Sequence, residues 1–187
     1  MKDLSIVLIT WNSQQYITAC MDALIRSVSS FNYQLFIVDN GSVDETLNIL
    51  NNYLSHNTVL IKNKKNKGVA HARNQALRLV TTDKVLLLDI DTEVNEQAIN
   101  ELVTYMDTNA RVGICAPKLL SLEGNAQLSC RRFPSLRYKF YNLLASKNIF
   151  VKGNQSQYYI QQMHGETPFE VEYVIGACQL IRKAALD

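Results

Sequence analysis

The chain has 187 residues, of which 47% are hydrophobic and 19% charged, a composition that fits a folded domain and excludes a disordered chain. Nineteen basic against 17 acidic residues give a net charge of +2, too small to indicate nucleic-acid binding, so we expect no nucleic-acid partner. There is no run of about 18 apolar residues and no signal peptide at the N-terminus, so we expect a cytoplasmic protein.

Predicted strands and helices alternate along the first 116 residues. Short apolar runs, rich in β-branched residues, predict strands at 5–9, 35–38, 59–61, 85–88 and 112–116. Apolar residues at helical spacing predict helices over 19–28, after Ser42, from Gly68, and through Met106, the last of these capped by Asn95. Ser42 and Glu45 match a capping box at the second helix. Such alternation predicts an α/β, Rossmann-like, mainly parallel sheet flanked by helices.

The pattern changes after Pro117. Residues 119–128 predict a hairpin around Gly124, residues 133–150 a loop and helix, and residues 169–175 a strand. We expect a single domain over 1–187, in which 1–116 form the core and 117–187 an elaboration on it. The cysteines Cys20, Cys115, Cys130 and Cys178 lack the spacing of a zinc or redox pair, and we expect reduced core residues.

Polar residues follow three of the predicted strands. Thr10 and Asn12 follow the first, Asp39 the second, and Asp89 and Asp91 the fourth. Any one of them could simply cap the loop that follows it. Ligands of parallel sheets bind outside the carboxyl ends of the strands, so the three together favour a binding site there.

Asp89 and Asp91 face the same way on an extended chain, because they are two residues apart. Two carboxylates aimed at one volume favour a hard cation, Mg²⁺ or Mn²⁺, and a bound diphosphate would complete its coordination. Gly68 and the amides after it open a helix, a natural place for phosphate, and Arg73 adds positive charge. We expect the lysines at 62, 64, 65 and 67 to lie in a solvated turn. We expect His71 and His164 to be structural or exposed residues, and not metal ligands.

Four stretches, residues 5–12, 37–46, 66–74 and 86–93, together resemble inverting glycosyltransferase family 2, which has the GT-A fold. Two later stretches, 129–134 and 174–182, resemble its rhamnosyltransferase-like branch, which builds bacterial surface polysaccharides. The resemblance implies that Thr10 and Asn12 border the nucleotide and that Asp39 hydrogen-bonds the base. It also implies that Asn66, Gly68, Arg73 and Asn74 shape the nucleotide and diphosphate pocket. Asp89 would contact the ribose or the water shell of the metal, and Asp91 would be a metal ligand. Gly176 and Ala177 would line the cleft for the sugar and the acceptor.

The implied function is metal-assisted transfer, with inversion, of a sugar from a nucleoside-diphosphate sugar to a glycan or lipid-linked acceptor. The family's catalytic base normally follows the Gly-Ala stretch, so we expect it beyond Asp187, in a longer protein. The resemblance thus implies that residues 117–187 are an incomplete elaboration on the acceptor side. Glu166, Glu170 and Glu172 lie near the Gly-Ala stretch, but we expect them to be solvent-facing carboxylates and not the catalytic base. The alternative is a nucleotide-sugar-binding module without turnover in this form.

Other nucleotide-binding classes fit poorly. Residues 10–15 lack the G-x-G-x-x-G of a dinucleotide-dependent oxidoreductase, the P-loop motif, and the Gly-rich, Arg-containing loop of a sugar nucleotidyltransferase. Residues 131–150 mix basic and aromatic side chains and fit peripheral contact with the inner face of a membrane, although we favour a helix packed on its own domain.

Overall fold

The computed structural model describes residues 3–133 and 167–186, which form two compact units. The first unit contains residues 3–117 and 176–186, and the second contains residues 118–133 and 167–175. Most of the basic and aromatic stretch, together with His164 and Glu166, lies outside the described residues. Among the residues described, no helix has the length and apolar character needed to cross a bilayer.

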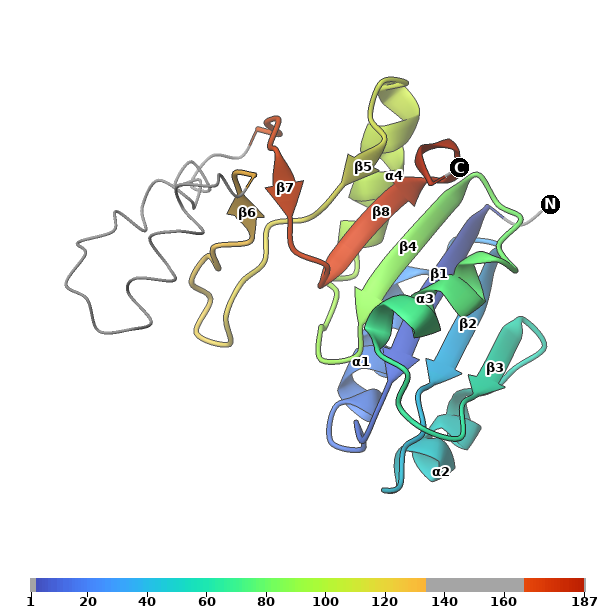
Figure 1. The fold of residues 1–187 in the computed structure, drawn as a ribbon. Helices are drawn as coiled ribbons and strands as arrows, with labels where there is room; N and C mark the ends of the chain where they lie inside the picture. Colours follow the sequence, from blue (N-terminus) through green and yellow to red (C-terminus); the bar gives the residue numbers. More distant parts are fainter. Residues whose placement is uncertain (1–2, 134–166, 187) are drawn as a thin grey trace. The chain divides into compact units, whose positions relative to one another are not determined.

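The first unit is built on a six-stranded sheet with the strand order β3-β2-β1-β4-β8-β5 (Figure 1). Neighbouring strands among the first four are parallel, whereas β8 is antiparallel to both β4 and β5. The strands are β1 (Leu4–Thr10), β2 (Tyr33–Asp39), β3 (Thr58–Lys62), β4 (Lys84–Asp89), β5 (Ile114–Cys115) and β8 (Cys178–Arg182). The predicted Rossmann-like, mainly parallel sheet is confirmed.

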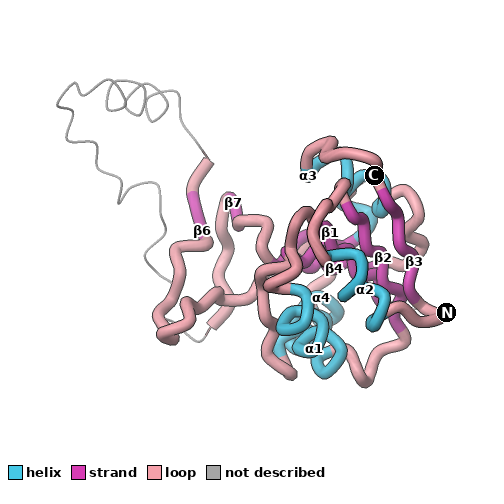
Figure 2. The backbone as a smooth tube through the Cα atoms, turned by 90° about the horizontal axis from the view of Figure 1, so that it is seen from below, coloured by secondary structure: helices cyan, strands magenta, loops and turns pink. Residues whose placement is uncertain are grey.

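Helices cover both faces of this sheet: α3 lies on one face, and α1, α2 and α4 lie on the other (Figure 2). Their bounds are α1 (Ile17–Ser27), α2 (Thr46–Leu50), α3 (Val69–Leu77) and α4 (Ala98–Thr108). One 3₁₀ turn, Asn51–Tyr53, follows α2, and another, Lys183–Ala185, follows β8. Under α3, the small side chains of Ala72 and Ala76 pack against Val7, Phe36 and Leu87. Because both faces are covered, successive strand residues are buried, which explains the continuous apolar runs.

Two expectations about this unit need correction. The strand predicted at 112–116 is reduced to Ile114–Cys115, and it pairs antiparallel with β8, which the sequence does not predict as a strand. The capping box is wrong, because α2 begins at Thr46 and Ser42 bonds elsewhere. In the last predicted helix, the Asn95 side chain accepts the Gln97 N–H and the helix begins at Ala98.

The second unit contains two short pairings. Leu120 and Ala126 form an antiparallel bridge around Gly124, whose φ of +81° suits a tight turn, so the predicted hairpin is confirmed. The strand β6 (Cys130–Arg131) pairs antiparallel with β7 (Tyr173–Val174), so only two residues of the strand predicted at 169–175 form one. Glu170 and Glu172 are exposed, as expected, and Glu172 accepts the Phe133 N–H at 2.7 Å.

Candidate functional site

The strands β1, β2 and β4 end at the same edge of the sheet, where Thr10 lies opposite Asp39, and Ile9 lies opposite Asp89. A pocket of about 320 Å³ opens at this edge, and we call it the strand-end pocket. Five predicted site residues line it: Thr10, Asn12, Asn66, Asp89 and Asp91. The other lining residues are Ile9, Trp11, Ser13, Tyr16, Asn40, Val69 and Ile90.

Reciprocal hydrogen bonds join the loops that follow β1 and β2. Asn12, with a φ of +49°, donates its N–H to Ser42 Oγ at 2.9 Å and accepts the Val43 N–H at Oδ1, also at 2.9 Å. The Ser13 N–H donates to Thr46 Oγ1 at 2.8 Å. These bonds fix one wall of the pocket, and they occupy the Asn12 side chain in holding the neighbouring loop.

Asp39 lies behind this wall and is only 1% exposed. Its Oδ1 accepts Thr10 Oγ1 at 3.1 Å and also the Ser42 hydroxyl, while its Oδ2 accepts the N–H groups of Gly41 and Ser42 at 3.2 and 3.1 Å. In this structure the carboxylate therefore organises the loop and supports Thr10, and Asp39 does not itself line the pocket.

A network of amide side chains holds the opposite loop, which leads into α3. Asn40 Nδ2 donates to Asn66 Oδ1 at 2.9 Å, and Asn40 Oδ1 accepts the Lys67 N–H at 3.1 Å. Asn66 Oδ1 also accepts the Gly68 N–H at 2.8 Å, where Gly68 has a φ of +84° and begins the turn into α3. Asn40 is not among the site residues predicted from the sequence, although its position directly after Asp39 is a signal that could have identified it.

Arg73 joins α3 to the end of β4. Its Nη2 donates to Asp89 Oδ1 at 2.6 Å and to the Gly176 carbonyl at 3.2 Å. The Asp89 N–H donates to the Ala177 carbonyl at 2.8 Å, so the predicted acceptor-side residues lie beside Asp89. Burial raises the pKa of the Asp89 carboxyl; Arg73 lowers it and Asp91 adds to the rise, and the net shift is upward. Asp91 is exposed.

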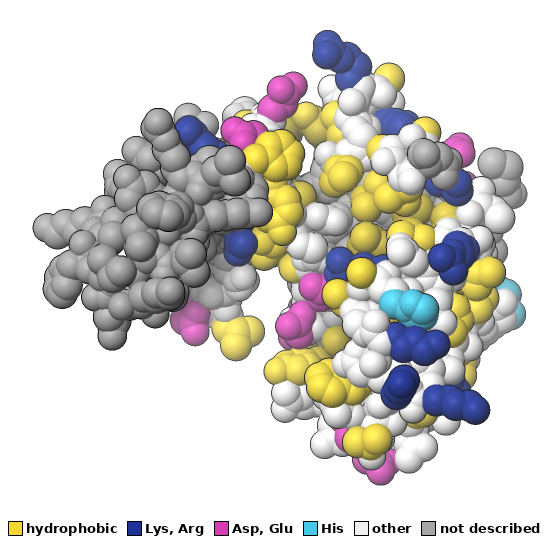
Figure 3. Space-filling model, in the orientation of Figure 1, with side chains coloured by type: hydrophobic (Ala, Val, Ile, Leu, Met, Phe, Trp, Pro, Cys, Tyr) yellow, Lys and Arg dark blue, Asp and Glu magenta, His cyan; other side chains and the backbone are white. Residues whose placement is uncertain are grey.

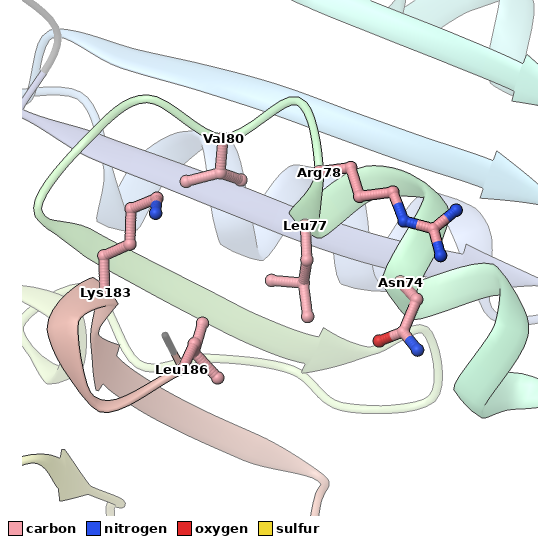
Figure 4. A pocket seen from close by; sticks show the side chains of 6 residues that line it. All are labelled: Asn74, Leu77, Arg78, Val80, Lys183 and Leu186. Atoms are coloured by element: carbon pink, nitrogen blue, oxygen red, sulfur yellow. The ribbon is translucent and has the colours of Figure 1, made fainter.

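Asn74 is not brought together with the other predicted site residues. It lines a different pocket of about 380 Å³, formed with Leu77, Arg78, Val80, Lys183 and Leu186 (Figure 4).

Positive charge gathers around α3 and the loop before it (Figure 3). Residues 46–82 contain six Lys or Arg residues and no Asp or Glu. Lys64, Lys65 and Lys67 are exposed in the loop before α3, as expected of a solvated turn, whereas Lys62, also exposed, is the last residue of β3. This charge adjoins Asn66 and Val69 of the strand-end pocket, and it favours the approach of an anion.

The described residues contain no cluster of three His, Cys, Asp or Glu side chains that could hold a metal by itself. Asp89 and Asp91 therefore offer an incomplete oxygen donor set, which fits a hard cation only if a ligand supplies further oxygens. Arg73 engages Asp89 Oδ1, and Oδ2 has no partner among the side chains and backbone that the structure describes.

A pocket lined by amides, hydroxyls and two carboxylates at the carboxyl edge of a parallel sheet is the place where α/β domains of this kind bind their ligands. The chain belongs to glycosyl transferase family 2, whose model matches residues 5–187. It is 29% identical over 160 residues to a poly(ribitol-phosphate) beta-glucosyltransferase of Bacillus spizizenii, covering 81% of this chain and 24% of that protein. It is 33% identical over 121 residues to a teichoic acid poly(glycerol phosphate) polymerase of Staphylococcus epidermidis, covering 63% and 16%. The matches thus span less than a quarter of each relative's length, and the rhamnosyltransferase-like branch stays a prediction.

Solved structures share the fold. The S. aureus TarS 1–349 structure in complex with UDP-GlcNAc aligns with a TM-score of 0.61 and 21% identity, over 83% of this chain and 51% of that one. A mannosyltransferase from Pyrobaculum calidifontis, in complex with GDP-Man and Mn²⁺, aligns with a TM-score of 0.60 and 18% identity, over 97% and 46%. The GT-A fold inferred from the sequence is therefore confirmed.

Proposed function

We propose that this chain is the donor-binding domain of an inverting glycosyltransferase, and that the strand-end pocket holds a nucleoside-diphosphate sugar. The single observation that carries the proposal is the convergence of Thr10, Asn12, Asn66, Asp89 and Asp91 on that pocket. The names of the relatives support a polyol-phosphate polymer or a lipid-linked sugar as the acceptor.

Each side of the pocket has a part in this proposal. The loops after β1 and β2, joined by Asn12 and Ser42, would bind and orient the nucleoside. The turn at Gly68 and the positive charge around it would face the diphosphate. The turn at Gly176 and Ala177, beside Asp89, would border the sugar and the acceptor.

We further propose that Asp91, with Asp89 beside it, holds a Mg²⁺ or Mn²⁺ ion together with the diphosphate. When bound, the ion would neutralise negative charge that develops on the leaving diphosphate. Inversion requires the acceptor hydroxyl to attack from the face opposite the leaving group, with a carboxylate base in hydrogen-bond reach. We assign no base among the described residues.

The test is a thermal-shift and calorimetry panel of uridine, thymidine and guanosine diphosphate sugars, each with and without Mn²⁺. A ligand at 100 times its Kd stabilises the fold by about 3 kcal/mol, which raises the melting temperature by several degrees. We expect Asp91→Ala to lose the metal-dependent part of the shift. Asp83→Asn is the matched control, because Asp83 is exposed and lies just before the first residue of β4, at the end of the strand away from the pocket.

A metal-dependent shift that persists in Asp91→Ala would remove Asp91 from this role. No shift with any nucleotide sugar would contradict donor binding altogether. Release of nucleoside diphosphate in the presence of acceptor distinguishes a transferase from a binding module without turnover.

A further inference from the structure

The side chain of Arg73 connects helix α3 to two segments at the end of the sheet. It starts on α3, is 22% exposed, and reaches both the Asp89 carboxylate and the Gly176 carbonyl through Nη2, at 2.6 and 3.2 Å. Both contacts use charged or strongly polar acceptors, and hydrogen bonds to a charged donor are stronger than neutral ones. Arg73 therefore ties α3, the end of β4 and the turn before β8 together.

The backbone joins the same two segments. The Asp89 N–H donates to the Ala177 carbonyl at 2.8 Å, just beyond the pairing of Leu88 with Cys178. The Thr92 N–H donates to the Asp89 carbonyl at 3.0 Å, which closes a tight turn around Asp91. Fixing Asp89 in place thus also restricts where Asp91 can lie.

Gly176 leaves the room that the guanidinium occupies. A Cβ atom at this position would lie 3.0 Å from Arg73 Nη1 and 3.4 Å from Nη2. This is tighter than ordinary van der Waals contact, so any larger residue would push the guanidinium away. The pairing of glycine at 176 with arginine at 73 therefore has a steric reason.

We infer that Arg73 is a positioning residue, which holds the Asp89–Asp91 turn against the turn at 176–177, and that it does not contact the nucleotide. The inference rests on the proposed function only in taking these two turns as the donor and acceptor sides. An arginine suits this role because the two N–H groups of Nη2 point in fixed directions from a planar guanidinium, one to Asp89 and one to Gly176, whereas a lysine ammonium rotates freely on a flexible stem.

The first test measures amide hydrogen exchange in the free protein, without nucleotide or metal. We expect Arg73→Gln to accelerate exchange of the Asp89 amide on the order of tenfold, because its Ala177 acceptor is no longer held. The Leu86 amide, in the middle of β4, should exchange as in the wild type. Arg73→Lys should show a smaller increase. Arg78→Gln, which removes an exposed arginine just beyond α3, is the matched control and should change neither amide.

Gly176→Ala tests the same contact from the other side. We expect it to accelerate Asp89 exchange as Arg73→Gln does, and the double variant to exchange no faster than either single one, since both remove one interaction. Unchanged Asp89 exchange in both single variants would overturn the inference, as would additive effects in the double variant.

The second test separates positioning from nucleotide contact. With Arg73→Gln, we expect nucleotide-sugar affinity with Mn²⁺ to fall about tenfold and affinity without metal to stay the same. Equal losses with and without metal would show a direct nucleotide contact and overturn the inference. If the wild type binds no nucleotide sugar, the proposed function fails, and the exchange experiment still decides the role of Arg73.

Discussion

Asp39 shows how a single buried carboxylate can organise the site without lining it. Four donors, the hydroxyls of Thr10 and Ser42 and the N–H groups of Gly41 and Ser42, converge on its two oxygens. We predict that Asp39→Asn lowers the free energy of unfolding by about 2–3 kcal/mol, because an amide NH₂ cannot accept hydrogen bonds from the donors that face it. Urea unfolding measures this change.

Asp83→Asn provides the comparison, since an exposed carboxylate should change stability by less than about 0.5 kcal/mol. Equal stabilities of Asp39→Asn and Asp83→Asn would mean that the donors around Asp39 find other acceptors, and the wall of the pocket would then need another explanation.

The buried thiols of Cys20 and Cys178 make a pH-dependent contribution to stability. Burial raises the pKa of each from an ordinary value of 9.0 to about 12. A pKa that is higher in the folded than in the unfolded state stabilises the fold below the unfolded value, and that stability is lost as the pH rises from about 9 towards 12.

We predict that unfolding free energy falls as pH rises above about 9, with each thiol contributing at most about 1.4 kcal/mol per pH unit. Denaturant unfolding at pH 8 and pH 10 measures the loss. The double variant Cys20→Ala with Cys178→Ala should show a smaller loss over the same range, although it is less stable at pH 8. An identical loss in both proteins would assign the effect to other groups.

At the scale of elements, the loop after β2 depends on the absence of a side chain at Gly41. This residue has a φ of +84°, and a Cβ there would lie 2.6 Å from the Cα of Lys65. We predict that Gly41→Ala destabilises the protein by more than the about 1–2 kcal/mol that a left-handed conformation alone imposes, because the loop before α3 must also move. Thermal unfolding is the measurement.

Gly124→Ala separates the two effects. Gly124 has a φ of +81°, and a Cβ there would meet nothing within 4 Å, so that variant carries backbone strain without a clash. If both variants lose the same stability, close packing of Gly41 on Lys65 is not needed to hold the loop.

Local patterns predict the elements of this chain better than their ends. Continuous apolar runs identify β1 to β4, and in β1, β2 and β4 these runs are buried because both faces of the sheet are covered. The capping box fails at Ser42, because its hydroxyl bonds to Asp39 and accepts from Asn12, 30 residues away. A rule based on residue spacing cannot predict these competing hydrogen bonds, because they form only where the loops after β1 and β2 meet.

For the whole molecule, topology decides what the sequence can predict. Parallel strands bring their carboxyl ends to one edge, so the meeting of Thr10, Asn12, Asp89 and Asp91 follows from strand assignments alone. Strand assignments do not predict that Asn74 lies outside the strand-end pocket, because its location depends on which face of α3 it occupies. The sequence also does not predict β8, since Gln179 and Arg182 interrupt its apolar run and its partners β4 and β5 lie more than 60 residues earlier.

The place of β8 leads to a prediction about the smallest chain that folds. Its residues Cys178, Leu180 and Ile181 are at most 3% exposed, and the strand lies between β4 and β5. Arg182 donates from its side chain to the carbonyls of Met106 and Val112 at 2.8 and 3.1 Å, so β8 also secures the end of α4. A chain of residues 1–117 lacks these contacts and leaves an apolar flank of β4 as an open edge.

We therefore predict that residues 1–117 alone do not unfold cooperatively, although they contain all the residues that line the strand-end pocket. Near-ultraviolet circular dichroism and thermal unfolding, compared with the 187-residue chain, test this. In the 187-residue chain, Leu180→Ala should lower the free energy of unfolding by about 2–5 kcal/mol, because it leaves a cavity in a fully buried position. If residues 1–117 showed the same melting transition as the 187-residue chain, β1 to β4 and their helices would suffice for folding, and β8 would position the turn at 176–177 without stabilising the sheet.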